Sequence, residues 1–107
     1  METNLKKLEE IFAEMAKDGV DIAFPLKWGF YFVDQNKDKL QNVFNEVKEH
    51  GYKMEHIELI DENEWQLMVT KKEILTAEQL HKRNLAFNEL ADRLEVDCYD
   101  GWDVEVA

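Results

Sequence analysis

The stretch DCYDGWDVEV, Asp97 to Val106, decides the fold, because it can form either one strand or two. Polar and apolar residues alternate at both of its ends, as in a half-buried strand. Asp100-Gly101 lies in the middle, and an Asp-Gly pair is typical of a tight hairpin turn or of a bulge within a continuous strand. A hairpin would leave two strands of about four residues, so we favour one strand over 96–106, distorted at Asp100-Gly101.

The facing of this strand depends on the distortion. In an undistorted strand, Cys98 and Trp102 point to the same face, and Asp100 is the one polar residue among them. A bulge shifts the register by one residue, so that Tyr99 instead of Cys98 joins Trp102, because a one-residue slip reverses every side chain. The sequence leaves both arrangements open.

The rest of the chain shows regular helical and strand periodicity. Apolar spacing of three and four predicts helices over 5–17, 37–50 and 76–94, and alternation predicts strands over 26–33, 53–60 and 64–71. Thr76 and Gln79 form a capping-box pattern at the start of the third helix. The order predicts an α+β, ferredoxin-like split βαβ fold (βαββαβ), an antiparallel sheet with an additional N-terminal helix. We expect a single domain over 1–107, with the N-terminal helix in 1–20 and the βαββαβ unit in 26–107.

The chain is strongly acidic, with a net charge of -11. Acidic residues are most concentrated after Arg93, where the sequence has Glu95, Asp97, Asp100, Asp103 and Glu105 and no basic residue. Such a surface repels phosphate backbones and anionic lipids, so we expect no direct nucleic-acid binding and no membrane binding. It attracts basic protein partners. One cysteine and the lack of a signal-peptide pattern or a bilayer-length apolar run favour a cytoplasmic protein.

Catalytic and metal-binding patterns are weak. Cys98 has no evident base or helix N-terminus beside it, and His50, His56 and His81 lie on separate elements without a ligand spacing. We therefore expect no metal, no cofactor and no enzymatic activity. A carboxylate on the apolar face, as Asp100 would be without a bulge, would have a raised pKa, so an enzyme using Asp100 with a nearby histidine is a rival hypothesis.

Binding has better support. A split βαβ sheet has one face covered by two helices, and the residues predicted on the other face include Tyr31, Val33, Met68 and, in one register, Tyr99. The N-terminal helix is one candidate to cover that face, and a dimer mate or another partner is the alternative. Leu85 lies opposite the buried stripe of its helix and is a further candidate contact.

Three stretches resemble one family over nearly the whole chain. ELADRLEVDCYDGWDVEV (89–106), EIFAEMAKDGVDIAF (10–24) and EVKEHGYKME (46–55) resemble the regulator of ribonuclease activity B family, also called ribonuclease E inhibitor proteins. The specific matches are the Tyr99-Asp100-Gly101-Trp102 turn and the Asp18-Gly19 turn. The resemblance implies a split βαβ fold with an N-terminal helix and a non-catalytic protein that binds the scaffold region of ribonuclease E and restrains RNA cleavage. Well-known members continue past this strand into a long acidic tail, whereas this sequence stops at Ala107.

These inferences define two sets of residues. The expected partner contacts, to ribonuclease E or another basic protein surface, are Asp97, Tyr99, Asp100, Asp103, Glu105, Tyr31 and Met68. The expected structural signature, two backbone turns and one core aromatic, consists of Asp18, Gly19, Asp21, Gly101 and Trp102. An immunity-type inhibitor of a nuclease toxin and a homodimer formed through the open sheet are the alternative functions.

Overall fold

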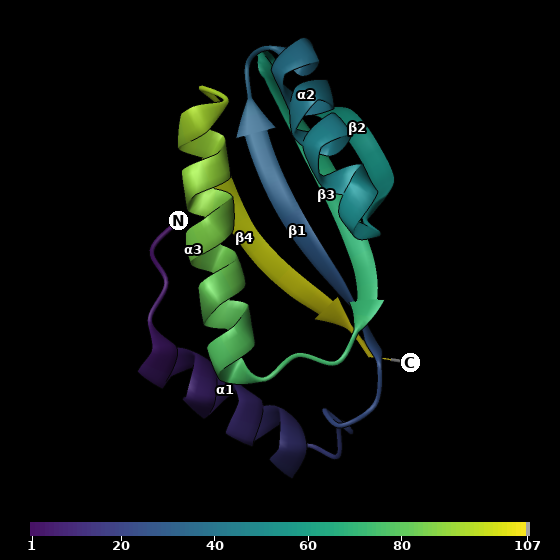
Figure 1. The fold of residues 1–107 in the computed structure, drawn as a ribbon, viewed down its shortest axis with the longest axis vertical. Coiled ribbons are helices and arrows are strands. Elements are labelled where there is room, and N and C mark those ends of the chain that lie inside the picture. The colour runs from purple at the N-terminus through teal and green to yellow at the C-terminus, as the bar shows by residue number, and fades with distance from the viewer. Residues whose placement is uncertain (107) are drawn as a thin grey trace.

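A computed structural model describes residues 1–106 and contains three α-helices and a four-stranded antiparallel sheet (Figure 1). In chain order the elements are α1 (Leu5–Lys17), β1 (Leu26–Asp34), α2 (Lys37–Val47), β2 (Lys53–Asp61), β3 (Glu64–Glu73), α3 (Ala77–Arg93) and β4 (Cys98–Glu105). The sheet order is β2-β3-β1-β4. This is the predicted α+β, ferredoxin-like arrangement with an additional N-terminal helix, so the fold class is confirmed.

The core lies between the sheet and the helices. Alternation in β1 buries Trp28, Phe30 and Phe32, none of which is more than 1% exposed, as predicted for the face toward α2 and α3. Leu67 and Val69 of β3 pair with Phe32 and Phe30 and continue the same apolar layer. Close packing of aromatic rings across strands and helices therefore fixes which face of the sheet the helices cover.

Helix ends follow the chemistry of the sequence. The Thr76 side chain accepts a hydrogen bond from the backbone of Gln79, and the Gln79 side chain accepts one from the backbone of Thr76, so the predicted capping box is present. The second helix is shorter than predicted, because α2 ends at Val47 and a 3-10 turn, Lys48–His50, follows. A final turn of this tighter form is common at helix ends.

The N-terminal helix lies on the side of the sheet that α2 and α3 cover. In Figure 1, α1 lies at the foot of α3, and the two helices contact each other. The ring of Phe12 stacks on that of Trp28, with centroids 5.7 Å apart, and Phe12 is buried. The prediction that the N-terminal helix covers the second face of the sheet is therefore wrong, because α1 packs on the same face as α2 and α3.

Strand β4 contains a bulge. Its pairing with β1 shifts between Tyr31, which faces Gly101, and Phe32, which faces Tyr99, so Asp100 has no partner of its own across the ladder. Gly101 has φ of 120°, a conformation that side chains disfavour. The single distorted strand is confirmed, and the register is the one that turns Tyr99 toward the helices. The strand begins at Cys98 rather than Val96, because the Val96 amide instead bonds to Ala91 at the end of α3.

Two further features concern the sheet. We call its face turned away from the helices the outer face. Strand β2 is irregular, since its pairing with β3 shifts between Met54 and His56. Val33 was expected to be an exposed apolar residue of the outer face, but it is only 2% exposed between its neighbours Gln66 and Cys98. That prediction was wrong because adjacent cross-strand side chains cover a short one. Over residues 1–106, none of the helices combines the length and apolar character needed to cross a bilayer.

Candidate protein-interaction surface

A hydrogen-bonded pair joins two strands on the outer face. Tyr31 of β1 donates its hydroxyl to Oδ2 of Asp103 on β4, at 2.8 Å. Burial of the phenol, followed by the hydrogen bond and the negative charge of Asp103, raises the pKa of Tyr31 to about 12. The pair keeps the Asp103 carboxylate folded onto the sheet while leaving the residue exposed.

Gly29 of β1 lies directly beneath this hydrogen-bonded pair. A Cβ built at Gly29 would lie 2.7 Å from both Oδ1 of Asp103 and the terminal methyl of Met68. The absence of a side chain therefore lets both groups lie flat across β1, and Met68 is half-buried as a result. Tyr31 and Met68, two of the predicted contact residues, are cross-strand partners and lie side by side on the outer face.

A charged network borders these residues. Nζ of Lys27 lies 2.8 Å from a carboxylate oxygen of Glu55, which also accepts a hydrogen bond from the Thr70 hydroxyl. The hydrogen bond from Lys27, followed by that from Thr70, lowers the pKa of Glu55, and the hydrogen bond to Glu55 raises the pKa of Lys27. Glu105 lies 3.7 Å from the same ammonium. The outer face is therefore a mixed polar surface around a small apolar centre.

The other predicted contacts form a row along the edge of the sheet. Among the described residues, strand β4 pairs on one side only, with β1. Four carboxylates, which we call the C-terminal carboxylates, are exposed on β4 or just before it: Asp97, Asp100, Asp103 and Glu105. Asp103 and Glu105 lie on the outer face beside Gly29 and Lys27, and Asp100 lies on the bulge. The row thus follows the edge from one end of β4 to the other.

The first of these carboxylates lies in a second acidic region. The backbone amide of Asp97 donates to Oδ1 of the buried Asp34, at 2.8 Å, which ties the start of β4 to the end of β1. Asp97 then lines a shallow hollow of about 350 Å³ at the β2–β3 turn, with Gln35, Asp61, Glu62, Asn63 and Glu64. Because carboxylates dominate this end of the sheet, it attracts cationic side chains.

Tyr99 is not available for contact. It is 1% exposed, and its hydroxyl donates to Oδ1 of Asn84, which is fully buried on α3. The bulge explains the difference from the predicted contact set, because it turns Tyr99 into the core and leaves Cys98 on the outer face opposite Val33. Burial of the thiol, with Asp100 as the next cause, raises the pKa of Cys98.

The residues of the structural signature lie at the end of α1, in the connection that follows it, and on β4. Asp18 caps the C-terminus of α1, Gly19 follows with φ of 88°, and Oδ1 of Asp21 accepts a hydrogen bond from the Ala23 amide. Trp102, expected as a core aromatic, is only partly buried, although its ring packs against Trp28 with centroids 5.7 Å apart. The edge position of β4 explains this, since within residues 1–106 only β1 lies beside β4 in the sheet.

Sequence reasoning did not single out Asn84, a fully buried polar residue of the core. Asn84 donates from its amide to the Thr3 hydroxyl, which in turn bonds to Nδ1 of His81, so a polar chain runs from Tyr99 to the N-terminal segment. The sequence does contain a signal, because Asn84 lies four residues after Leu80 and three before Phe87 on the buried stripe of α3. Within the described part of the chain, His, Cys, Asp and Glu residues form no group of three or more placed to hold a metal ion.

Comparison with known proteins agrees with this structure. A family model described as regulator of ribonuclease activity B matches residues 6–104. The chain belongs to the regulator of ribonuclease activity B family. None of the curated proteins matches the chain at a significant level. Membership assigns the chain to a family of regulators, and the match extends from the first turn of α1 into β4, beyond the bulge.

Proposed function

We propose that this chain is a non-catalytic regulator that binds ribonuclease E, or a related basic protein surface, and inhibits RNA cleavage. Family membership over residues 6–104 supports a ribonuclease as the enzyme that is regulated. The observation that carries the mode of binding is the row of exposed C-terminal carboxylates along the edge of the sheet. A row of like charges attracts an Arg- or Lys-rich segment and orients it along β4.

The outer face provides the second half of the contact. Tyr31 lies on β1, next to the edge strand β4, and Met68 lies beside it on β3, so an aromatic and a flexible apolar side chain lie close to Asp103. Aromatic residues and methionine are enriched in protein interfaces, and methionine adapts to irregular surfaces. A basic segment with some apolar side chains would therefore bury Tyr31 and Met68 while its cations meet Asp103 and Glu105.

An RNA-cleavage assay with full-length purified ribonuclease E tests this function. The expected result is a cleavage rate that falls as the chain is added and recovers as the salt concentration rises, because exposed ion pairs are screened by salt. The chain alone should leave the RNA intact. Uninhibited cleavage in the presence of excess chain, or cleavage by the chain alone, would contradict the proposal.

A matched pair of triple variants tests the role of the edge. Asp97→Asn, Asp100→Asn and Glu105→Gln remove three of the C-terminal carboxylates, whereas Glu9→Gln, Glu10→Gln and Glu49→Gln remove three exposed carboxylates from helical segments. Both changes raise the net charge equally. Only the first is expected to weaken inhibition, by about tenfold. Equal loss in both variants would show that net charge, and not the edge of the sheet, attracts the enzyme.

A further inference from the structure

Lysines converge on a pocket at the end of the sheet where β2 begins and β3 ends. The pocket has a volume of about 260 Å³ and is lined by Lys27, Gly51, Lys53, Glu55, Thr70, Lys71 and Lys72. We call it the lysine pocket. Within residues 1–106, its lining combines four cations with one carboxylate. The pocket is therefore positive, on a chain that has 24 acidic and 13 basic residues and a net charge of -11.

The strand register places two of these cations opposite each other. Lys72 of β3 is the cross-strand partner of Lys27 on β1, and Lys53 of β2 is the partner of Thr70, two residues before Lys72 on the same face of β3. Like charges in directly opposed positions of a sheet repel each other and lower its stability. The arrangement therefore favours a role of this positive charge in binding rather than in folding.

The carboxylate of the lining is already engaged. Nζ of Lys27 lies 2.8 Å from Oε1 of Glu55, and the hydroxyl of the buried Thr70 donates to the same oxygen, at 2.9 Å. Glu105 lies 3.7 Å from the Lys27 ammonium and adds a second negative charge on that side. Within the described part of the chain, both ion pairs at the pocket thus belong to Lys27.

The other three lysines bring their charges to the pocket from two strands. Lys53 and Lys72 are exposed. Lys71 is partly buried, with Nζ 5.3 Å from the centroid of the Tyr52 ring and Cε 3.5 Å from a Cβ built at Gly51. The aromatic ring and the close backbone therefore hold the Lys71 side chain at the wall of the pocket. Three ammonium groups at one pocket favour a ligand with several negative charges.

The chemistry of the cations distinguishes between anions. Arginine pairs with a planar carboxylate through two parallel hydrogen bonds, whereas lysine is a point charge that is a common phosphate binder. The four cations of the described lining are all lysines. A phosphate monoester carries a charge of about −1.5 to −2 at neutral pH, and two linked phosphate groups carry about three negative charges. A diphosphate group therefore matches Lys53, Lys71 and Lys72 better than a single carboxylate does.

Carboxylates near the pocket limit the length of the ligand. Glu58 lies three residues after Glu55 on β2, and Asp103 lies two residues before Glu105 on β4, and both are exposed. A nucleic-acid strand carries a negative charge at every nucleotide, so these carboxylates repel a strand that follows the sheet away from the pocket. The charge distribution therefore suits a short phosphate-bearing ligand.

We propose that the lysine pocket binds a small ligand through a diphosphate group. Lys53, Lys71 and Lys72 contact the phosphate oxygens, and Glu55 lowers the affinity because it already holds Lys27. The shared chemistry covers inorganic diphosphate and nucleoside diphosphates. The inference goes beyond the proposed function and does not depend on it, since its test involves no ribonuclease.

Isothermal titration calorimetry at low salt tests the proposal, with inorganic diphosphate as the probe. Orthophosphate and citrate are the comparison ligands, because the first has one phosphate group and the second carries a similar charge on carboxylates. The wild-type chain is expected to bind diphosphate at least about fivefold more tightly than either comparison ligand. No binding of diphosphate, or equal affinity for citrate, overturns the inference.

Two further titrations distinguish the sources of the diphosphate group. Adenosine diphosphate that binds more tightly than inorganic diphosphate would assign the pocket to nucleotides, and weaker binding would assign it to diphosphate itself. Both results agree with the proposal. A short oligoribonucleotide that binds more tightly than either ligand would overturn it in favour of a nucleic-acid partner.

A matched pair of double variants locates the site. Lys53→Gln with Lys72→Gln removes two exposed cations from the pocket, and Lys6→Gln with Lys17→Gln removes two exposed cations from α1. Both changes alter the net charge equally, and circular dichroism checks that both variants fold. The pocket variant is expected to lose at least about tenfold in affinity for diphosphate, and the α1 variant less than about twofold. Equal losses in the two variants overturn the inference.

Glu55→Gln provides a test of opposite sign. Removing this carboxylate releases Lys27 to the ligand and removes a repulsive charge, so the affinity for diphosphate is expected to rise by about threefold or more. Glu9→Gln, which neutralises an exposed carboxylate of α1, is expected to change the affinity by less than about twofold. A decrease in affinity for Glu55→Gln would overturn the proposal, because the carboxylate would then assist binding instead of competing with the ligand.

Discussion

The hydroxyl of Tyr99 donates a hydrogen bond to Oδ1 of Asn84 at 2.6 Å, and both side chains are buried. This bond joins the edge strand β4 to the middle of α3 inside the core. It exists because the bulge turns Tyr99 inward, so the local irregularity at Asp100-Gly101 determines a long-range contact between two layers of the fold. Burial in this position raises the pKa of Tyr99.

Removing the hydroxyl from this pair should destabilise the chain. Tyr99→Phe leaves Oδ1 of Asn84 without its donor in the core, and an unsatisfied buried acceptor costs about 1–3 kcal/mol. Urea unfolding is the measurement, with a lower midpoint and an unchanged slope. Tyr31→Phe is the control, because its partner Asp103 is exposed and water replaces the lost bond, so the expected loss is below about 1 kcal/mol. Equal losses of unfolding free energy in the two variants would show that the buried bond between Tyr99 and Asn84 stabilises the chain no more than the exposed bond does.

Substitution of Gly101, the glycine of the bulge, should destabilise the chain. Gly101→Ala places a side chain at φ of 120°, and such strained conformations cost about 1–3 kcal/mol, although the nearest atom, the sulfur of Met1, is 3.9 Å away and leaves room. In Gly29→Ala the added Cβ instead meets neighbouring atoms, those of the Met68 and Asp103 side chains, whose flexible ends can move. Unfolding experiments should therefore give a larger loss for Gly101→Ala. Only Gly29→Ala should alter the titration of Tyr31, since it displaces Asp103. The reverse order of stability would contradict the strain at the bulge.

Local patterns were sufficient to predict most of the fold. Alternation located β1 and β3, and the Thr76-Gln79 pair located the start of α3, because these signals depend on neighbouring residues alone. The register of β4 could not be predicted from such local patterns. Cys98 and Tyr99 can each face a core, so the alternation pattern is satisfied in both registers, and only packing against Phe32 and Phe87 selects Tyr99.

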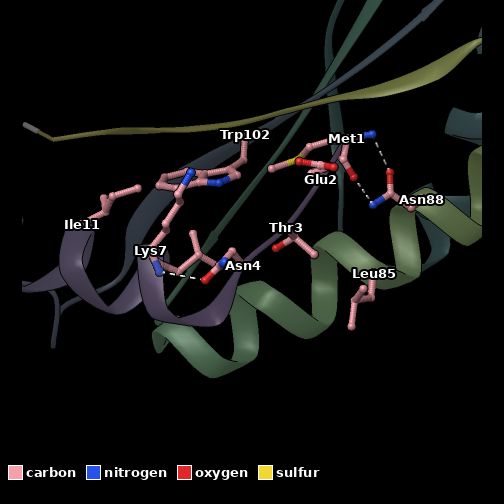
Figure 2. A pocket seen from close by; sticks show the side chains of 10 residues that line it. Met1, Glu2, Thr3, Asn4, Lys7, Ile11, Leu85, Asn88 and Trp102 are labelled. Carbon is pink, nitrogen blue, oxygen red and sulfur yellow. Dashed lines mark hydrogen bonds between the residues drawn. The ribbon is translucent and has the colours of Figure 1, made fainter.

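The position of α1 could not be predicted for a related reason. An amphipathic pattern indicates that a helix has an apolar face but not which surface this face covers, and the stacking of Phe12 on Trp28 is a contact between distant parts of the chain. The hollow lined by Met1, Ile11, Leu85 and Trp102 (Figure 2) depends on that placement, because Ile11 reaches it only when α1 lies at α3. The C-terminal carboxylates, by contrast, were identifiable from sequence because their exposure follows from their charge.

The ion pair between Arg83 of α3 and Glu73 should stabilise the chain more than the exposed pair between Arg93 and Glu46. Arg83 donates two hydrogen bonds to the Glu73 carboxylate, at 2.8 and 2.9 Å, and a third to the Tyr52 hydroxyl, and the hydrogen bonds to Glu73 are the main cause of the raised pKa of Arg83. The side chains of the pair are only 22% and 15% exposed. Arg83→Met therefore leaves a carboxylate in a mostly buried site, and we expect a loss of about 3 kcal/mol in urea unfolding.

Arg93 provides the control for this prediction. Its pair with Glu46 has a similar distance, 3.0 Å, but the side chains are 60% and 50% exposed. Arg93→Met should cost less than about 1 kcal/mol, because water and salt screen exposed pairs. Arg83→Lys should restore little of the loss at position 83, since a lysine cannot make the paired hydrogen bonds. Similar losses for Arg83→Met and Arg93→Met would show that burial does not strengthen the first pair.

The three tyrosines should make the fold sensitive to alkaline pH. Burial is the main cause that raises the pKa of Tyr31 and of Tyr52, each to about 12, and it also raises the pKa of Tyr99. In the unfolded chain these phenols titrate near about 10. Because the folded pKa lies above the unfolded value, the stabilisation is complete below about pH 10 and is lost as the pH rises toward about 12.

Tyrosinate absorbance and circular dichroism, recorded together against pH, test whether stability is lost as the pH rises. In native conditions the absorbance should stay flat through about pH 10 and rise only as the circular dichroism signal is lost, whereas in concentrated urea it should rise near about pH 10. Tyr31→Phe serves as the comparison, because it removes the least buried of the three phenols and should leave the coupled transition of Tyr52 and Tyr99 in place. A phenol that ionises near about pH 10 while the fold remains intact would contradict the burial of that side chain.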